Sequence, residues 1–146
     1  MAAVHESVEI GAPTDEVWGL VMDPERLGDW VTAHREVHDA PDLPLAEGDG
    51  FRQKLCVAGK SFDVSWTLVE CEAPTLAVWK AKGPKGAGAD VRYELSENGE
   101  GTRFEYLNDF DLPGGPLKII AGGIARAPAK RTARKSLARL KRLLES

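Results

Sequence analysis

The chain has 146 residues, of which 42% are hydrophobic and 29% are charged, and its formal net charge is −4. This length is sufficient for one domain with a hydrophobic core, and the composition argues against a disordered or membrane-spanning chain. No stretch of about 20 consecutive apolar residues occurs, so we expect no transmembrane helix.

The N-terminus and the cysteines bear on where the protein resides. The first residues form neither a basic nor an apolar segment, so we expect no signal peptide. Two cysteines, Cys56 and Cys71, are too few for a disulfide framework and predict reduced thiols. We therefore expect a cytoplasmic protein.

The first third of the chain predicts a strand, two short helices and a second strand. In chain order these elements are residues 2–10, 12–22, 23–30 and 35–41. Thr14 is a favourable N-cap for the first helix, and acidic residues follow it in the first turn. Asp23 caps the second helix, and Pro24 occupies its first position.

From residue 50 onward the pattern changes to strands alone. Alternating apolar and polar residues predict five strands, at 51–57, 61–70, 75–81, 90–96 and 102–112. Turns at residues 59–60 and 98–99 predict the pairs Leu55–Val64 and Tyr93–Phe104. These registers gather apolar side chains on one face and leave charged ones such as Arg52 and Glu94 on the other, as in an antiparallel sheet with one wet face.

A long C-terminal helix over residues 117–144 is the element that covers the buried face. Its predicted apolar stripe is Ile120, Ile124, Ala127, Leu137, Leu140 and Leu144. Gly122, Gly123 and Pro128 weaken the front of this helix. Two interpretations are open. The small residues at the front of the helix leave room for a cavity with a portal, or they simply pack closely against large aromatic side chains of the sheet.

These elements predict a single α+β domain over residues 1–146. Its order is one strand, two short helices, six strands and a final helix, with seven antiparallel strands wrapped around that last helix. This order and the segment APTDEVWGLVMDPERLGDW (Ala12–Trp30) resemble the START-like, helix-grip superfamily (SRPBCC), which includes polyketide cyclases, lipid-transfer domains and plant pollen allergens. The resemblance implies a cavity between sheet and helix that binds a small hydrophobic molecule.

Two further segments are similar to one branch of this superfamily. GDWVTAH (Gly28–His34) and FEYLNDFDLPGGPLKIIAGGIA (Phe104–Ala125) resemble an actinobacterial branch identified as the toxin half of type II toxin–antitoxin pairs. That resemblance implies an antitoxin protein as partner. The superfold serves binding, transport and catalysis alike, so resemblance alone does not decide the activity.

The candidate ligand-binding residues are those that the strand phase turns inward, together with one at the expected mouth. They are Trp30, Gln53, Trp66, Trp79, Tyr93, Tyr106, Asn108, Phe110 and Ile120. Trp30, at the end of the second helix, is the one expected at the mouth. A few polar groups in an apolar hollow orient a ligand, although they equally bond to one another or to water.

The sequence offers few candidates for catalytic residues or metal ligands. Glu6 is the one carboxylate that the strand phase places inside, and a strand-end position near water is the alternative. Without an inward acid–base pair we expect a non-catalytic binding protein; the enzyme alternative is a polyketide cyclase or dehydratase using Tyr93, Tyr106 and Glu6. His34 and His38 lack further ligands, so we expect no metal, and no motif indicates a cofactor.

The charge is unevenly distributed along the chain. Residues 116–146 hold nine of the 19 basic residues and one of the 23 acidic ones. Such a segment attracts an anionic partner or neutralises its own acidic body. It contains no aromatic residue for base stacking, so we do not expect nucleic-acid binding.

Overall fold

The computed structural model describes residues 2–57, 59–113 and 122–146, with side chains for 3–57, 59–113 and 129–146. The described elements are β1 (Ala2–Ile10), α1 (Thr14–Val21), η1 (Pro24–Arg26), α2 (Leu27–Trp30), β2 (His34–His38), β3 (Gly50–Val57), β4 (Lys60–Glu72), β5 (Leu76–Lys82), η2 (Pro84–Gly86), β6 (Gly88–Asn98), β7 (Gly101–Asp111) and α4 (Gly122–Glu145). Within them, no helix is long and apolar enough to cross a membrane.

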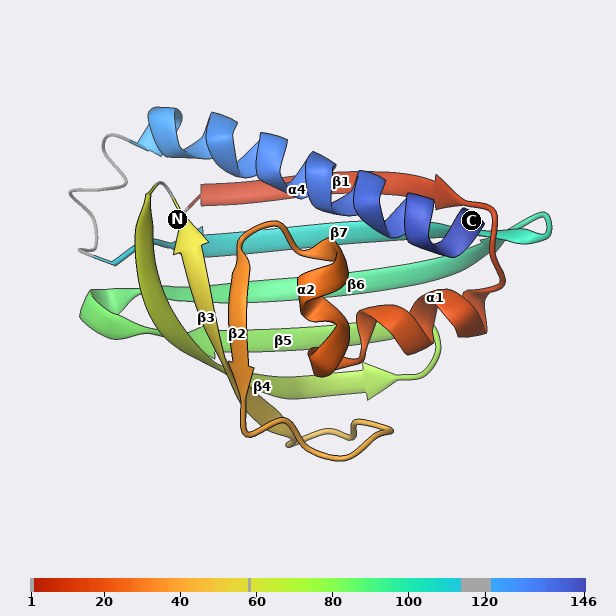
Figure 1. Cartoon of the computed structure of the whole chain (residues 1–146), viewed down its shortest axis with the longest axis horizontal. Coiled ribbons are helices and arrows are strands. Elements are labelled where there is room, and N and C mark those ends of the chain that lie inside the picture. Colours follow the sequence, from red (N-terminus) through yellow and green to blue (C-terminus); the bar gives the residue numbers. More distant parts are fainter. Residues whose placement is uncertain (1, 58, 114–121) are drawn as a thin grey trace.

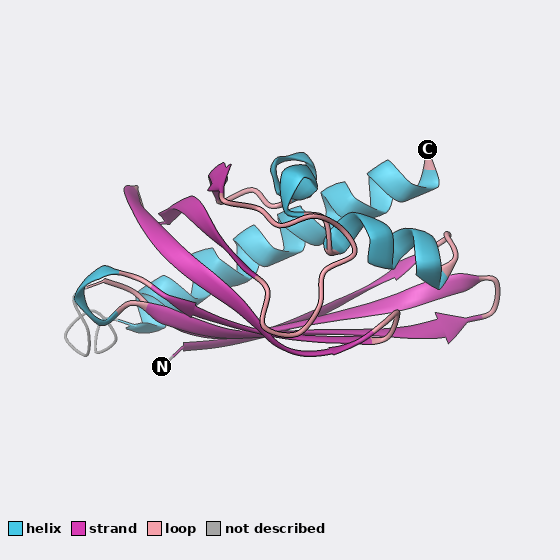
Figure 2. Cartoon of the chain, turned by 90° about the horizontal axis from the view of Figure 1, so that it is seen from below, coloured by secondary structure: helices cyan, strands magenta, loops and turns pink. Residues whose placement is uncertain are grey.

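The described strands form one curved antiparallel sheet of seven strands in the order β1-β7-β6-β5-β4-β3-β2. Helix α4 crosses the concave face along β1, and α1 and α2 lie beside it on the same side (Figure 1). Figure 2 shows the sheet curling up around the helices. The predicted α+β helix-grip fold is confirmed.

Both predicted hairpin registers are wrong by two residues, although the predicted faces are right. Leu55 pairs with Phe62 rather than with Val64, and Tyr93 pairs with Tyr106 rather than with Phe104. Each turn lies one residue away from its predicted place, and Gly99 has the positive φ of 64° that suits a tight turn. Moving a turn by one residue shifts the register by two, which preserves the alternation of faces.

The helix caps follow the prediction in part. Asp23 accepts a hydrogen bond from the Glu25 amide at 3.0 Å and caps η1 as predicted. Helix α1 is capped by Pro13 instead of Thr14, which is already helical. The Thr14 hydroxyl lies 3.2 Å from that of Thr102, because tertiary packing brings β7 beside the start of α1.

The core lies between the concave face of the sheet and the described α-helices. The largest completely buried side chains are Trp30, Phe104, Leu68, Leu140 and Val17. Leu137 and Leu140 of the predicted α4 stripe are buried, and Leu144 packs against the same cluster. The predicted stripe residues Ile120, Ile124 and Ala127 lie outside the residues whose side chains are described.

Candidate ligand-binding cavity

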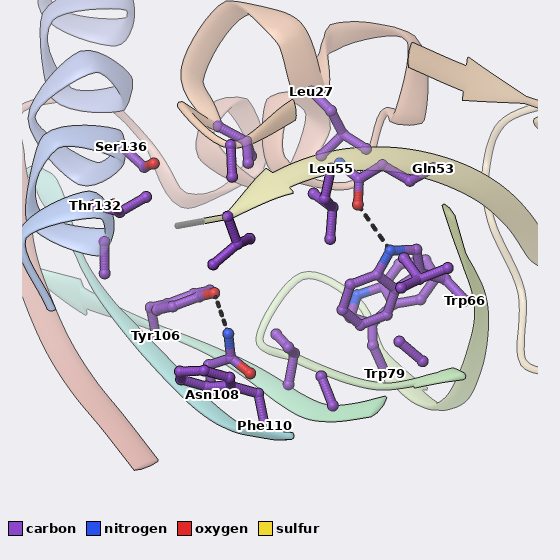
Figure 3. Close-up of a pocket in the computed structure, with 18 of the residues that line it drawn as sticks. Leu27, Gln53, Leu55, Trp66, Trp79, Tyr106, Asn108, Phe110, Thr132 and Ser136 are labelled. Atoms are coloured by element: carbon purple, nitrogen blue, oxygen red, sulfur yellow. Dashed lines mark hydrogen bonds between the residues drawn. The ribbon is translucent and has the colours of Figure 1, made fainter. Parts of the chain in front are cut away.

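A cavity of about 240 Å³ lies between the sheet, α2 and α4. Its described lining is mostly aliphatic and aromatic. Tryptophan and cysteine aside, the polar side chains among the described lining residues are Gln53, Tyr93, Tyr106, Asn108, Asp111, Thr132 and Ser136. Figure 3 shows two hydrogen-bonded pairs on opposite sides of this space, Gln53 with Trp66 and Asn108 with Tyr106. An apolar hollow with a few polar groups is the usual form of a small-molecule site.

Eight of the nine residues predicted from the sequence line this cavity. They are Trp30, Gln53, Trp66, Trp79, Tyr93, Tyr106, Asn108 and Phe110. The ninth, Ile120, lies outside the described residues. Trp79 faces inward because its strand buries Ala77, Trp79 and Ala81 while Lys80 and Lys82 are exposed.

Trp30 does not lie at a mouth, contrary to the prediction. Its side chain is only 1% exposed and its ring packs edge-on against Tyr93 and Phe104. The physical reason is the packing of α2 against both α4 and the sheet, which carries the end of the short helix into the core. Trp30 therefore belongs to the inner wall of the cavity.

Gln53 is a buried residue at the centre of a chain of polar contacts between Trp66 and His34. Its side chain is 3% exposed, its Oε1 accepts from Trp66 Nε1 at 2.8 Å, and its Nε2 lies 2.8 Å from Nδ1 of His34. Because Oε1 is already accepting from the indole, the amide nitrogen donates to Nδ1 and the hydrogen of neutral His34 resides on Nε2. Burial is the main cause that lowers the pKa of His34, and the positive charge of Arg35 lowers it further.

On the facing side, Asn108 and two tyrosines form a second polar group. Asn108 Nδ2 donates to the Tyr106 hydroxyl oxygen at 3.0 Å, and the Tyr106 and Tyr93 rings lie 6.1 Å apart. Burial raises the pKa of Tyr106 to about 12 and that of Tyr93 still further. Both phenols therefore stay protonated near neutral pH and act as hydrogen-bond donors and acceptors rather than as bases.

Three buried polar atoms of lining residues have no hydrogen-bond partner in the described part of the chain. They are Nε1 of Trp30, Nε1 of Trp79 and Oδ1 of Asn108. Exchanging the two amide atoms of Asn108 would leave its nitrogen unpaired instead. An unpaired buried polar group costs about 1–3 kcal/mol of folding free energy.

The connection between α2 and β2 is tied to α4 above the cavity. The Thr32 amide donates to Ser136 Oγ at 3.1 Å, and the Thr32 hydroxyl lies 3.4 Å from the Thr132 carbonyl oxygen. Ser136 is buried and lines the cavity. These contacts attach the α2–β2 connection to the helix over the cavity.

The sequence profile of a known family matches residues 1–145, and that family is described as "Polyketide cyclase / dehydrase and lipid transport". The chain belongs to this family. A search of curated protein sequences finds no match.

Solved structures with the same fold share little sequence with this family member. Protein CV1439 from Chromobacterium violaceum is 12% identical with a TM-score of 0.76, covering 100% of this chain and 99% of that one. TTHA0849 from Thermus thermophilus is 16% identical with a TM-score of 0.75, covering 97% and 96%. DynU16, from the dynemicin biosynthetic locus, is 23% identical with a TM-score of 0.69, covering 100% and 48%.

The family description includes cyclases and dehydratases, whose reactions need a group that gives or takes a proton, so the ionisable side chains near the cavity bear on the activity. Glu6 points to the inner side of the sheet but does not line the cavity; its carboxylate lies 2.7 Å from Arg134 Nε and 3.9 Å from Lys130 Nζ of α4. Sequence reasoning missed Asp111, which ends β7 and is the carboxylate among the described lining residues. The alternation of faces that turns Phe110 inward predicts an outward Asp111, so no sequence pattern indicated this residue.

His34 was considered in the sequence only as a metal ligand. The structure places it in the Gln53 chain, a role visible only once the pairing of β2 with β3 sets His34 opposite Leu55. Within the described residues, no group of three His, Cys, Asp or Glu side chains is arranged to hold a metal ion.

Proposed function

We propose that this protein binds a small hydrophobic molecule, lipid-like or aromatic and polyketide-like, in the cavity between the sheet and α4, without catalysing a reaction. The observation that carries the proposal is the mostly apolar hollow of about 240 Å³ with amide and phenol groups at two places in its wall. Its volume lies just below the usual range of ligand pockets, which favours a molecule of modest size.

The non-catalytic part of the proposal rests on the protonation chemistry of the wall. General acid–base catalysis works best with a group whose pKa is near the working pH. The pKa values of Tyr93 and Tyr106 are raised by burial, and the side-chain amides of Gln53 and Asn108 do not titrate. Such groups hold and orient a ligand but exchange protons poorly near pH 7.

Titration with the neutral fluorescent dye N-phenyl-1-naphthylamine tests the binding proposal. We expect saturable binding by the wild-type chain and a loss of at least tenfold in affinity when Ala133→Leu fills the cavity from α4, where Ala133 is buried and lines it. Ala138→Leu is the matched control, because Ala138 is exposed on the same helix. Circular dichroism verifies that both variants fold. Absence of saturable binding by the wild-type chain would sink the proposal.

One observation favours an enzyme as the second candidate: Asp111 lines the cavity. In a polyketide cyclase or dehydratase, this carboxylate would act as the proton acceptor while Tyr93 and Tyr106 donate hydrogen bonds to a carbonyl. Glu6, which the sequence suggested for this role, does not line the cavity. Turnover of a poly-β-ketone mimic that is lost in Asp111→Asn or Tyr93→Phe would decide for the enzyme.

The toxin hypothesis requires a partner for the basic C-terminal segment. In the described part of that segment, Arg134 and Lys130 contact Glu6, and Lys141 contacts Glu145 and the Glu9 carbonyl oxygen. These three basic residues are thus used within the chain itself, and their contacts give an antitoxin or nucleic-acid partner no support.

The cytoplasmic location expected from the unpaired Cys56 and Cys71 is checked by cell fractionation.

A further inference from the structure

We propose that a proton taken up by His34 is transmitted to the cavity: the protonated ring reverses the side-chain amide of Gln53, this breaks the hydrogen bond that holds Trp66 in the wall, and ligand binding weakens. This inference rests on the proposed binding function and assigns a proton-dependent control to the same site. It follows from the directions in which these three side chains can donate hydrogen bonds.

The hydrogen bonds between Trp66, Gln53 and His34 can run in only one direction. An indole N–H donates and never accepts, so Trp66 Nε1 requires Oε1 of Gln53 as its acceptor at 2.8 Å. The amide nitrogen of Gln53 then faces Nδ1 of His34 at 2.8 Å, and this nitrogen can only donate. Nδ1 must therefore offer a lone pair, which requires a neutral ring.

A protonated His34 is incompatible with this arrangement. Both ring nitrogens of a charged histidine are donors, so the N–H at Nδ1 and the amide N–H of Gln53 would point at each other. Turning the Gln53 amide by half a rotation offers its oxygen to the ring, and a hydrogen bond from a charged donor is roughly twice as strong as a neutral one. The same rotation places the amide nitrogen against Trp66 Nε1, so the indole loses its acceptor.

The packing around His34 favours this reversal over an outward turn of the ring. The ring lies against α2, where a Cβ added at Gly28 would be 3.3 Å from His34 Cδ2. An outward turn would leave the amide nitrogen of Gln53 without its partner, although that side chain is only 3% exposed. Reversal of the amide instead gains a hydrogen bond from the charged ring.

The charged groups around His34 determine the pH at which it is protonated. Burial and the charge of Arg35 lower the pKa of His34, so protonation in the folded chain occurs below the ordinary value of 6.5. The Arg35 guanidinium donates to the carbonyl oxygens of His34 and Thr32, and α4 faces the α2–β2 connection with the uncharged Thr132 and Ser136. The other titratable side chains on α2, β2 and β3 are Asp29, Glu36, His38, Arg52, Lys54 and Cys56. The ionic ones among these pair with one another, with Arg26 or with Asp39.

Release of Trp66 changes the wall that a ligand contacts. Trp66 lines the cavity, its ring packs edge-on against that of Trp79, and its hydrogen bond to Gln53 is drawn in Figure 3. A ligand that packs against Trp66 in its present position binds more tightly to the chain with neutral His34. Affinity therefore falls as the pH drops through the pKa of His34, and by reciprocity a bound ligand makes His34 harder to protonate.

Nuclear magnetic resonance of the indole N–H groups tests the transmission without any ligand. Trp66→Phe assigns the Trp66 signal, and the wild-type chain is titrated from about pH 8 to about pH 5. We expect the Trp66 signal to shift together with the ring signals of His34, with a midpoint below pH 6.5. The Trp18 signal is the control, because Trp18 packs on the core from α1 and does not line the cavity.

The affinity for N-phenyl-1-naphthylamine over the same pH range tests the effect on binding. We expect it to fall severalfold on acidification in the wild-type chain and in His38→Gln, and to stay constant in His34→Gln, whose amide oxygen still accepts from Gln53 but does not titrate. An effect of the lining carboxylate Asp111 would persist in His34→Gln, so this variant separates the two groups. Circular dichroism verifies that each chain stays folded at each pH.

The outcomes distinguish a failure of this inference from a failure of the proposed function. If the dye binds at no pH, the binding function fails, and the indole signals alone decide whether the proton reaches the wall. If the dye binds equally well at every pH, the binding function stands and the proton-dependent control is refuted. If His34 titrates while the Trp66 signal stays fixed, the ring turns outward alone and the transmission through Gln53 is refuted. The wild-type titration decides this even where a variant does not fold.

Discussion

The amide nitrogen of Gln53 lies 2.8 Å from Nδ1 of His34, so a buried side chain of β3 orients a partly exposed ring on β2. The same amide group accepts from Trp66, which lines the cavity. The cavity wall is thereby connected through one side chain to the edge strand of the sheet.

Removing that connection should destabilise the fold. Gln53→Leu leaves Trp66 Nε1 and His34 Nδ1 without their partner, and we expect the free energy of unfolding to fall by about 2 kcal/mol. Combining it with Trp66→Phe removes the orphaned donor as well, so the double variant should lose less than the sum of the two single losses. Urea denaturation measures all three variants, and strictly additive losses would refute the coupling.

His34 should make stability depend on pH. Its pKa is lowered in the folded chain from the ordinary value of 6.5, so on acidification the unfolded chain takes up the proton first. The free energy of unfolding is then fully present above about pH 6.5 and falls as the pH drops toward the lowered pKa of the folded state. Denaturation at a series of pH values should show this slope in the wild-type chain and a smaller one in His34→Gln. His38→Gln, on an exposed ring of the same strand, is the control that should retain the slope.

The ion pair between β1 and α4 should contribute measurably to stability. Glu6 is only 12% exposed and contacts Arg134 Nε at 2.7 Å. Glu6→Gln is expected to lower the free energy of unfolding by about 1 kcal/mol and to weaken its dependence on salt. Glu94→Gln breaks the pair with Arg92, in which the carboxylate side chain is 42% exposed, and should cost less than half as much. Equal losses in thermal unfolding at low salt would contradict this ranking.

Two glycines should respond to alanine in opposite directions. A Cβ at Gly101 would lie 2.5 Å from the Ile10 carbonyl oxygen, so Gly101→Ala should destabilise the chain by about 1–3 kcal/mol. Gly19 lies inside α1 with open space around its Cα, so Gly19→Ala should stabilise by up to about 1 kcal/mol. The melting temperatures of the two variants measure these effects. A shift in the same direction for both would show that the close approach of β1 and β7 does not determine the effect of alanine at position 101.

Local patterns predicted which residues face the interior but not their exact neighbours. Tyr93 and Tyr106 were both assigned to the inner face, and yet their direct pairing was missed because the turn begins at Gly99. A register shift of two residues keeps every side chain on its predicted face of the sheet, but it changes the residue that lies opposite on the neighbouring strand. The prediction of the cavity wall was therefore more accurate than the prediction of its contacts.

By itself, the sequence determined the order of the elements, the inward face of each strand and the covering of the sheet by the last helix, because hydrophobic periodicity and turn residues are local properties. Tertiary structure alone decided that Trp30 is buried in the inner wall, that His34 bonds to Gln53 and that Glu6 is neutralised by Arg134. Each of these depends on the packing of elements distant in sequence, which no local pattern encodes.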